Sequence, residues 1–262
     1  MYYYHEYNPD TRLTPWVKNY WSASGFASSE VLPKVFPDGC TDVIFTFDGT
    51  QGTSSACLFG TMTTFIEVDY PKSTQMFGIR FKPAGITAFT RVPVAELTDR
   101  SVELSLIETL FEKSFYETLP EKQSVAEIVA HTNSALLRLF SCLYQSDRQI
   151  MRAVDLISLA KGQCSLADVA SDVCLCQRHF ERKFKDVIGV SPKMFAKIFR
   201  FKNAMRCMQT YPSKDLLTIA VESGYYDHTH LIKDFKSLSG DTPNVFRQKK
   251  SIFYAYGDEY II

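Results

Sequence analysis

The sequence lacks long hydrophobic runs: no stretch of about 18 apolar residues, the length that a helix needs to cross a bilayer, occurs in it. Its first residues contain neither the basic segment nor the apolar core of a secretory signal. Seven cysteines are an odd number, and a chain of 262 residues can bury a core without disulfide cross-links. We therefore expect a cytoplasmic protein with reduced thiols and no membrane contact.

Signatures of common enzyme classes are missing as well. The chain has no phosphate-binding loop, no nucleophile elbow and no glycine pattern of a dinucleotide-binding fold. Four carboxylates near predicted turns have no histidine or motif beside them: Asp38, Asp42, Glu67 and Asp69. We expect these four to be solvated turn residues, and we predict no catalytic residue, no cofactor and no metal.

The net charge is zero, but charged residues are distributed unevenly along the chain. Residues 1–145 carry eleven basic and sixteen acidic side chains, whereas residues 146–250 carry eighteen basic and eleven acidic ones. This segregation favours a second half that meets a polyanion and a first half that does not. Solvated, lysine-rich helices would give the same imbalance, so charge alone leaves both interpretations open.

The first half alternates short apolar runs with turn residues. Four of these runs have the composition of β-strands: 42–47, 56–60, 64–68 and 75–81. From Ala84 the spacing becomes helical, most clearly over 104–119 and 125–143. Short strands at this spacing predict a small sheet or a barrel with flanking helices.

We therefore predict an α+β chain with two domains. Residues 1–145 would form a β-rich, barrel-like domain for regulation or dimerisation, residues 146–250 an all-α domain that folds alone, and residues 251–262 a tail. Aromatic side chains near the N-terminus could form core or line a pocket, with core the commoner case: Tyr2, Tyr3, Tyr4, Tyr7, Trp16, Tyr20 and Trp21.

The second half contains an internal repeat, formed by residues 165–192 and 215–243. When Ala170 is aligned with Ala220, Cys174 falls on Gly224, and the second copy has one extra residue in its turn. A pattern found twice is much harder to obtain by chance than a pattern found once. Each copy predicts a short helix, a tight turn and a second helix.

The second helix of each copy has an apolar face and a polar face. The positions spaced for burial are Phe180, Phe184 and Ile188 in the first copy, and Leu231, Phe235 and Leu238 in the second. The outward positions are Gln177, Arg178, Glu181, Arg182 and Lys185 in the first, and His228, Thr229, Ile232, Lys233 and Lys236 in the second. Such a face, held by a partner helix, is suited to reading base edges in the major groove of double-stranded DNA.

A third helix is predicted between the two copies. Ser191 and Pro192 have the N-cap and first-position residue types of a helix start, and Tyr211 with Pro212 would end it. Such a helix would hold the two motifs at a fixed separation, so that they reach successive major grooves about one turn of DNA apart.

Residues 149–248 resemble the AraC/XylS family of bacterial transcription regulators. The residues that carry the resemblance include Arg178–Phe180, Gly189–Pro192, Ser223–Tyr225 and Thr242–Pro243. The resemblance implies a unit of seven helices bound to promoter DNA, with recognition roles for Arg178, Glu181, Arg182, His228, Thr229, Ile232 and Lys233. Cys174 and Cys176 depart from the family, which usually has a turn glycine and a Ser or Thr cap there.

The first half resembles an uncharacterised domain found ahead of such DNA-binding halves, on the residues Phe36–Phe45, Gly78–Pro83 and Glu96–Arg100. This resemblance implies a sensory or dimerising domain. We predict a transcription regulator rather than an enzyme, controlled by a small-molecule effector or by a homodimer contact. The alternatives are control by protein contacts alone, or an enzyme that its second half targets to DNA.

Two further interpretations of the second half concern metal and redox chemistry. His228 and His230 are two residues apart on a predicted helix and point to different faces, so they cannot hold one metal ion. Cys176, at a helix start near Arg178, has surroundings that could favour a reactive thiolate. Burial of such a cysteine as a small apolar residue is the commoner case.

Overall fold

The computed structural model describes residues 2–25, 34–48, 54–68, 74–107, 110–122, 124–142, 146–248 and 253–254. The chain divides into two compact units. The first comprises Met1–Leu32, Cys40–Gly60 and Asp69–Ser146, and the second comprises Pro33–Gly39, Thr61–Val68 and Asp147–Ile262. Two short segments of the first half thus belong to the second unit. Most of the predicted tail lies outside the described residues.

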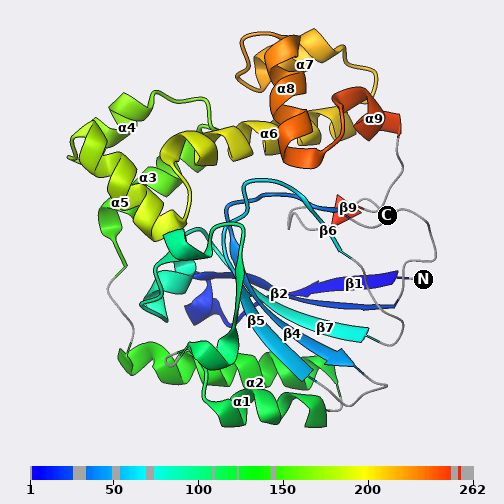
Figure 1. Ribbon diagram of the computed structural model, residues 1–262, viewed down its shortest axis with the longest axis vertical. Coiled ribbons are helices and arrows are strands. Elements are labelled where there is room, and N and C mark those ends of the chain that lie inside the picture. Colours follow the sequence, from blue (N-terminus) through cyan, green and yellow to red (C-terminus); the bar gives the residue numbers. More distant parts are fainter. Residues whose placement is uncertain are drawn as a thin grey trace. The chain divides into compact units, whose positions relative to one another are not determined.

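A six-stranded sheet forms the centre of the first unit (Figure 1). Its strands are β1 (Tyr2–Tyr7), β2 (Val17–Gly25), β4 (Thr41–Asp48), β5 (Ser54–Phe59), β7 (Thr74–Phe81) and β8 (Ser101–Glu103). They lie in the order β1-β2-β7-β4-β5-β8, and every neighbouring pair is antiparallel. Within the described residues β1 and β8 are free edges, so the sheet is open rather than barrel-like. The strand character of β1 and β2 was not predicted.

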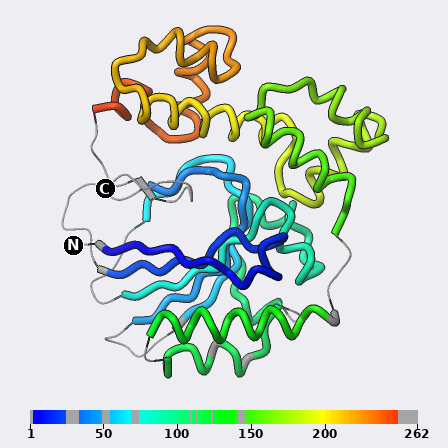
Figure 2. The backbone as a smooth tube through the Cα atoms, turned by 180° about the vertical axis from the view of Figure 1, so that it is seen from behind, coloured from blue at the N-terminus to red at the C-terminus, as the bar shows by residue number. Residues whose placement is uncertain are grey.

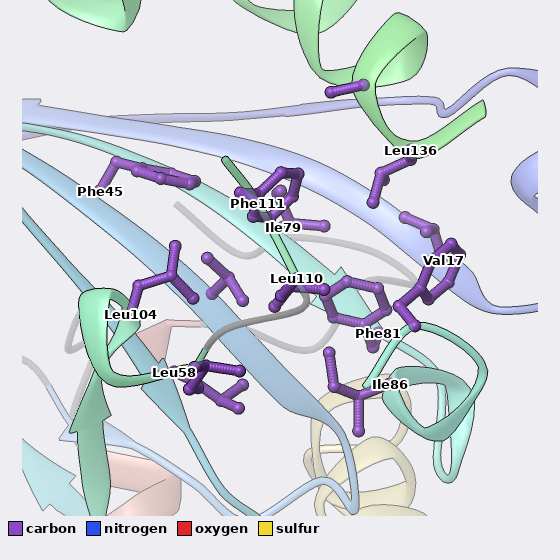
Figure 3. Close-up of a cluster of buried hydrophobic side chains, with 14 of the residues drawn as sticks. Val17, Phe45, Leu58, Ile79, Phe81, Ile86, Leu104, Leu110, Phe111 and Leu136 are labelled. Carbon is purple, nitrogen blue, oxygen red and sulfur yellow. The ribbon is translucent and has the colours of Figure 1, made fainter. Parts of the chain in front are cut away.

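One face of the sheet carries the core of the first unit. Alternate residues of β4 are buried there, because successive side chains of a strand point to opposite faces. Figure 3 shows Phe45, Ile79 and Phe81 gathered with Leu110 and Phe111 in this cluster. The helices α1 (Lys113–Glu117) and α2 (Val125–Arg138) lie beside each other across this side of the unit (Figures 1 and 2).

The prediction of one helix over residues 104–119 is wrong. The described part of this segment contains a 3-10 turn (Leu104–Leu106) and the short helix α1. Its apolar residues recur at helical spacing, and Leu104, Leu110 and Leu119 are indeed buried. Separate turns bury these three leucines as well as one continuous helix would. The backbone conformation of this segment is therefore set by packing against the core and not by the helical spacing of its apolar residues. The prediction for 125–143 is confirmed by α2 and the 3-10 turn Leu139–Cys142, while Leu143 lies outside the described residues.

Asp42 is not the solvated turn residue that the sequence indicated. It lies within β4, where its carboxylate accepts hydrogen bonds from Arg80 Nε at 3.1 Å and from Trp21 Nε1 at 2.9 Å. Arg80 is only 4% exposed, and a buried guanidinium requires such a partner. Glu67 is exposed, Asp38 is buried, and Asp69 lies outside the described residues.

The second unit has seven helices among its described residues. They are α3 (Arg148–Leu159), α4 (Leu166–Asp172), α5 (Gln177–Ile188), α6 (Pro192–Thr210), α7 (Leu216–Glu222), α8 (His228–Ser239) and α9 (Pro243–Gln248). Figure 1 shows α6 running from the group of α3, α4 and α5 to the group of α7, α8 and α9. A small sheet of β6 (Ile66–Glu67), β3 (Lys34–Val35) and β9 (Phe253–Tyr254) completes this unit. No helix in the described part of the chain is long and apolar enough to cross a membrane.

Asn133 fixes α2 to the N-terminal strands. Its Oδ1 accepts a hydrogen bond from the Tyr20 hydroxyl at 2.8 Å and another from the Asp10 backbone N–H at 2.9 Å. Tyr20 is fully buried, and this burial raises the pKa of its phenol, which therefore remains a donor at neutral pH.

We predict that Asn133→Ala lowers the free energy of unfolding by about 1–3 kcal/mol, because it leaves the buried Tyr20 hydroxyl without an acceptor. The matched control is Ser134→Ala, since the exposed Ser134 hydroxyl donates only to Ala130 of its own helix. Urea unfolding of the full chain measures both. Equal stability of the two variants would contradict the assigned role of Asn133.

Candidate nucleic-acid interface

The two helical motifs of the second unit have the same dimensions. Their first helices, α4 and α7, have 7 residues each, and their second helices, α5 and α8, have 12 each. The turn between the helices spans residues 173–176 in the first motif and 223–227 in the second. The predicted extra residue in the second turn is therefore confirmed.

Both turns close with the same backbone hydrogen bond. The Leu175 N–H donates to the Ala170 carbonyl, and the Tyr225 N–H donates to the Ala220 carbonyl, each at 2.9 Å. Ala170 and Ala220 are buried, in agreement with the small side chain that a close helix crossing requires. This agreement between the motifs confirms the alignment of Ala170 with Ala220.

Cys174 adopts the left-handed backbone conformation that the turn requires. Its φ is 56°, and the φ of Gly224 at the aligned position is 79°. A residue with a Cβ atom is strained in this region by about 1–2 kcal/mol, whereas glycine is not. Cys174 is therefore a strained replacement for the glycine that the second motif retains.

The starts of α5 and α8 also differ. Asp227, the N-cap of α8, accepts a hydrogen bond from the His230 N–H at 2.7 Å, as predicted. Cys176, the N-cap of α5, makes no side-chain cap bond, and it is exposed, as is Cys174. The first motif thus has the less stabilised turn of the two.

The helix α6 packs against both motifs. It begins as predicted, with Ser191 as N-cap and Pro192 at its first position, and it ends before Tyr211. Near its start the Phe195 ring meets the Phe184 ring of α5 at 5.4 Å between centroids. Further along, Phe201 meets Phe235 of α8 at 4.9 Å. The six positions predicted to be buried on α5 and α8 are all at most 1% exposed: Phe180, Phe184, Ile188, Leu231, Phe235 and Leu238.

The predicted recognition residues lie on the opposite sides of α5 and α8. Seven of them are exposed: Gln177, Arg178, Glu181, Arg182, His228, Thr229 and Lys233. Ile232 is half-buried. Within the described residues Arg178 and Arg182 have no hydrogen-bond or ion-pair partner, whereas Gln177 Nε2 donates to Glu181 Oε1 at 3.1 Å. The two guanidinium groups are therefore available to an external ligand.

Other polar residues of these helices bind within the unit. Lys183 pairs with Asp147 at 2.8 Å, so it supports α3 rather than the outer face. His230 stacks edge-on against Tyr225 at 5.2 Å, and its Nε2 lies 3.6 Å from Asp234. In the part of the chain that the structure describes, no group of three His, Cys, Asp or Glu side chains could hold a metal ion.

Comparison with protein families agrees with this geometry. Residues 169–249 match the model described as "Helix-turn-helix domain", and residues 5–103 match the one described as "Domain of unknown function (DUF6597)". The second half of the chain therefore contains a helix-turn-helix domain. Among curated proteins, none matches the sequence significantly.

Several solved structures are similar to parts or most of the chain. ToxT from Vibrio cholerae is 11% identical over 94% of this chain and 98% of that one, with a TM-score of 0.43. An AraC-type transcriptional regulator from Chromobacterium violaceum is 24% identical over 38% of this chain and 89% of its own, with a TM-score of 0.35. The DNA-binding domain of AdpA, solved with a target DNA, is 19% identical over 39% and 92%, with a TM-score of 0.37.

The strained turn of the first motif predicts stability changes of opposite sign at the aligned positions 174 and 224. Cys174→Gly should raise the free energy of unfolding by about 0.5 kcal/mol, because released strain exceeds the added entropy of the unfolded chain. Gly224→Ala should lower it by about 1–2 kcal/mol, since a Cβ there is strained and would lie 2.4 Å from Gln163 Cγ.

Urea unfolding of the full chain measures both changes. Cys174→Ala is the matched control, because it removes the sulfur and keeps the Cβ atom, and its stability should stay within about 0.5 kcal/mol of the parent. If Cys174→Gly and Cys174→Ala shift stability equally, loss of the thiol rather than release of strain explains the change.

Proposed function

We propose that the protein is a transcription regulator that reads two segments of the major groove in promoter DNA. The observation that carries this proposal is the duplicated motif, with two exposed recognition helices joined by the continuous helix α6. The 19 residues of α6 correspond to a helix of about 28 Å. This length is comparable with the ~34 Å between successive turns of one groove.

Different contacts follow from the side chains of the two helices. Arg178 and Arg182 are one helical turn apart and can each donate two hydrogen bonds to guanine N7 and O6. Gln177 lies directly before Arg178, and Glu181 lies between the two arginines. The Gln177 amide can also reach base edges. We assign this first helix the larger share of guanine recognition.

The second helix has a less basic set of recognition residues. His228 and Thr229 occupy the first turn of α8, which enters the groove first in helix-turn-helix proteins. Ile232 offers an apolar contact to a thymine methyl group, and Lys233 a charge for a phosphate or a guanine. This combination favours a mixed, A·T-containing second segment.

We also propose that the first unit controls DNA binding through an effector or a homodimer contact. Its acidic balance disfavours a second DNA surface. Its surface has an open depression of about 840 Å³, lined by apolar residues that include Val92 and Leu97 and by polar residues that include Glu96 and Arg100. Because the described sheet is open, we propose this depression beside β8 as the effector site. The helix-turn-helix domain and the resemblance of the second half to AraC-type regulators favour such a regulator over an enzyme targeted to DNA.

We predict that Arg182→Ala weakens binding to the cognate site by about 10- to 100-fold, which corresponds to a lost base contact of about 1–3 kcal/mol. Binding to a random duplex should weaken far less. The cognate site is obtained by selecting sequences that the full chain binds from a random DNA pool, and affinities are measured by fluorescence anisotropy at fixed salt.

The matched control for Arg182 is Arg12→Ala, which removes an exposed arginine of the first unit that pairs with Asp10. This control should leave both affinities unchanged. Equal losses on cognate and random DNA for Arg182→Ala would identify Arg182 as a phosphate contact and overturn its recognition role.

Control by the first unit predicts that a small molecule stabilises the full chain or that the chain dimerises. A thermal-shift screen measures the first effect, and light scattering across a range of protein concentrations measures the second. A compound that stabilises the chain should no longer do so when Arg100 in the depression is replaced by alanine. A chain that no compound stabilises and that stays monomeric at high concentration would contradict both modes of control.

A further inference from the structure

Two segments of the first half belong to the same compact unit as the helix-turn-helix motifs. They are residues 34–39 and 61–68, together named the clamp. Their strands pair with each other in antiparallel register, with Lys34 opposite Glu67 and Val35 opposite Ile66. β3 also pairs with β9, in parallel, so that it lies between β6 and β9 in the small sheet that Figure 1 shows. The clamp therefore connects parts of the sequence more than a hundred residues apart.

The clamp supplies Phe36 to the buried core of the second motif. Phe36 is 1% exposed, and its ring meets Phe201 of α6 edge-on at 5.8 Å between centroids. Phe201 is the same residue that packs against Phe235 of α8. Without Phe36, the contact between α6 and α8 would have an unfilled side.

A second contact lies at the C-terminal end of α8. Lys34 Nζ donates to the Ser239 carbonyl at 3.2 Å and pairs with the Asp241 carboxylate at 3.1 Å. The last carbonyls of a helix lack partners and carry partial negative charge, so an ammonium group stabilises them. Lys34 also lies 4.4 Å above the Phe65 ring, and the Thr64 hydroxyl donates to the Ser237 carbonyl at 3.1 Å.

A third contact lies at the C-terminal end of α5. The Thr61 hydroxyl donates to the Ile188 carbonyl at 2.6 Å, and Thr61 is 1% exposed. In the other clamp segment, Gly39 has a φ of 83°, and a Cβ atom there would lie 2.7 Å from the Phe195 ring. The clamp thus binds the last turn of both recognition helices, at the ends opposite to the first-turn residues assigned to base contacts.

The clamp is also joined covalently to the sheet of the first unit. Residues 34–39 lead into β4 at Thr41, and residues 61–68 follow β5, which ends at Phe59. These two strands pair with each other, with Asp42 opposite Phe59. An effector or a second subunit that changes this strand pair would therefore act directly on both clamp segments, because each segment is continuous with one of the two strands.

We propose that Lys34, Phe36 and Thr61 are positioning residues, which hold the two recognition helices at the orientation that binds DNA and couple this orientation to the strand pair β4–β5. This inference rests on the proposed function and deepens it. An effector can act through the clamp only by its different affinities for the clamped and released arrangements.

The test uses the full chain with Thr61→Val, which keeps the side-chain shape and removes the hydroxyl, and Lys34→Met, which keeps the apolar stem and removes the charge. Hydrogen exchange measured by mass spectrometry without DNA should speed up in the last turn of α5 for Thr61→Val alone. It should speed up in the last turn of α8 for Lys34→Met alone. The controls are Thr210→Val and Lys82→Met, two exposed residues of the same types.

Affinity for the DNA selected by the parent chain should fall about tenfold in each clamp variant and in neither control. In a footprint, Thr61→Val should lose the half of the site bound by α5, and Lys34→Met the half bound by α8. Thr61→Ser retains a hydroxyl, so its hydrogen exchange and DNA affinity should equal those of the parent chain. This result would show that Thr61→Val acts by losing the hydrogen bond and not by failing to fold.

Unchanged hydrogen exchange at both helix ends would overturn the proposal that the clamp holds α5 and α8. Faster exchange with full DNA affinity would overturn its positioning role and leave only a contribution to stability. If the parent chain selects no DNA sequence, the proposed function fails instead, and the exchange measurement still decides whether the clamp holds the helices.

Discussion

The packing of α6 against both motifs is the constraint on which the second unit depends. One helix contributes Phe195 to the first motif and Phe201 to the second. Because an α-helix is stiff over this length, the two aromatic contacts fix the spacing and the rotation of α5 relative to α8. The exposed faces of α5 and α8 therefore depend on these buried rings for their relative geometry.

The two motifs, although built alike, are stabilised by different local features. The second retains a glycine at the left-handed turn position and a capping carboxylate at the start of its recognition helix. The first has Cys174 and Cys176 at these places. The second motif in turn receives Phe36 and Lys34 from outside its own sequence. Local stabilisation and long-range support are therefore distributed differently between the two halves of the proposed DNA surface.

Much of the second unit could be predicted from sequence because its signals are local. Helical spacing located the buried positions from Phe180 to Leu238, and residue types located the caps at Ser191 and Asp227. The first unit was harder, because a six-stranded sheet is defined by partners distant in sequence. Asp42 looked solvated until β7 placed Arg80 opposite it. The predicted strand 64–68 contains β6 of the clamp, but its pairing with Lys34–Val35 could not be predicted, since a two-residue strand has no periodicity to detect.

Residues 34–39 and 61–68 lie in the first half of the sequence but belong to the second unit. This arrangement limits how the two halves of the chain can be recombined during evolution. Domains joined by a simple linker can be exchanged by a single recombination event between them. Here an exchange at residue 146 would separate Thr61 from the Ile188 carbonyl and Phe36 from Phe201. A new DNA-binding half would have to arrive with matching changes at two sites inside the first half. Under the proposed function, substitutions on α5 and α8 change DNA specificity while keeping these contacts, whereas an exchange of the two halves removes them.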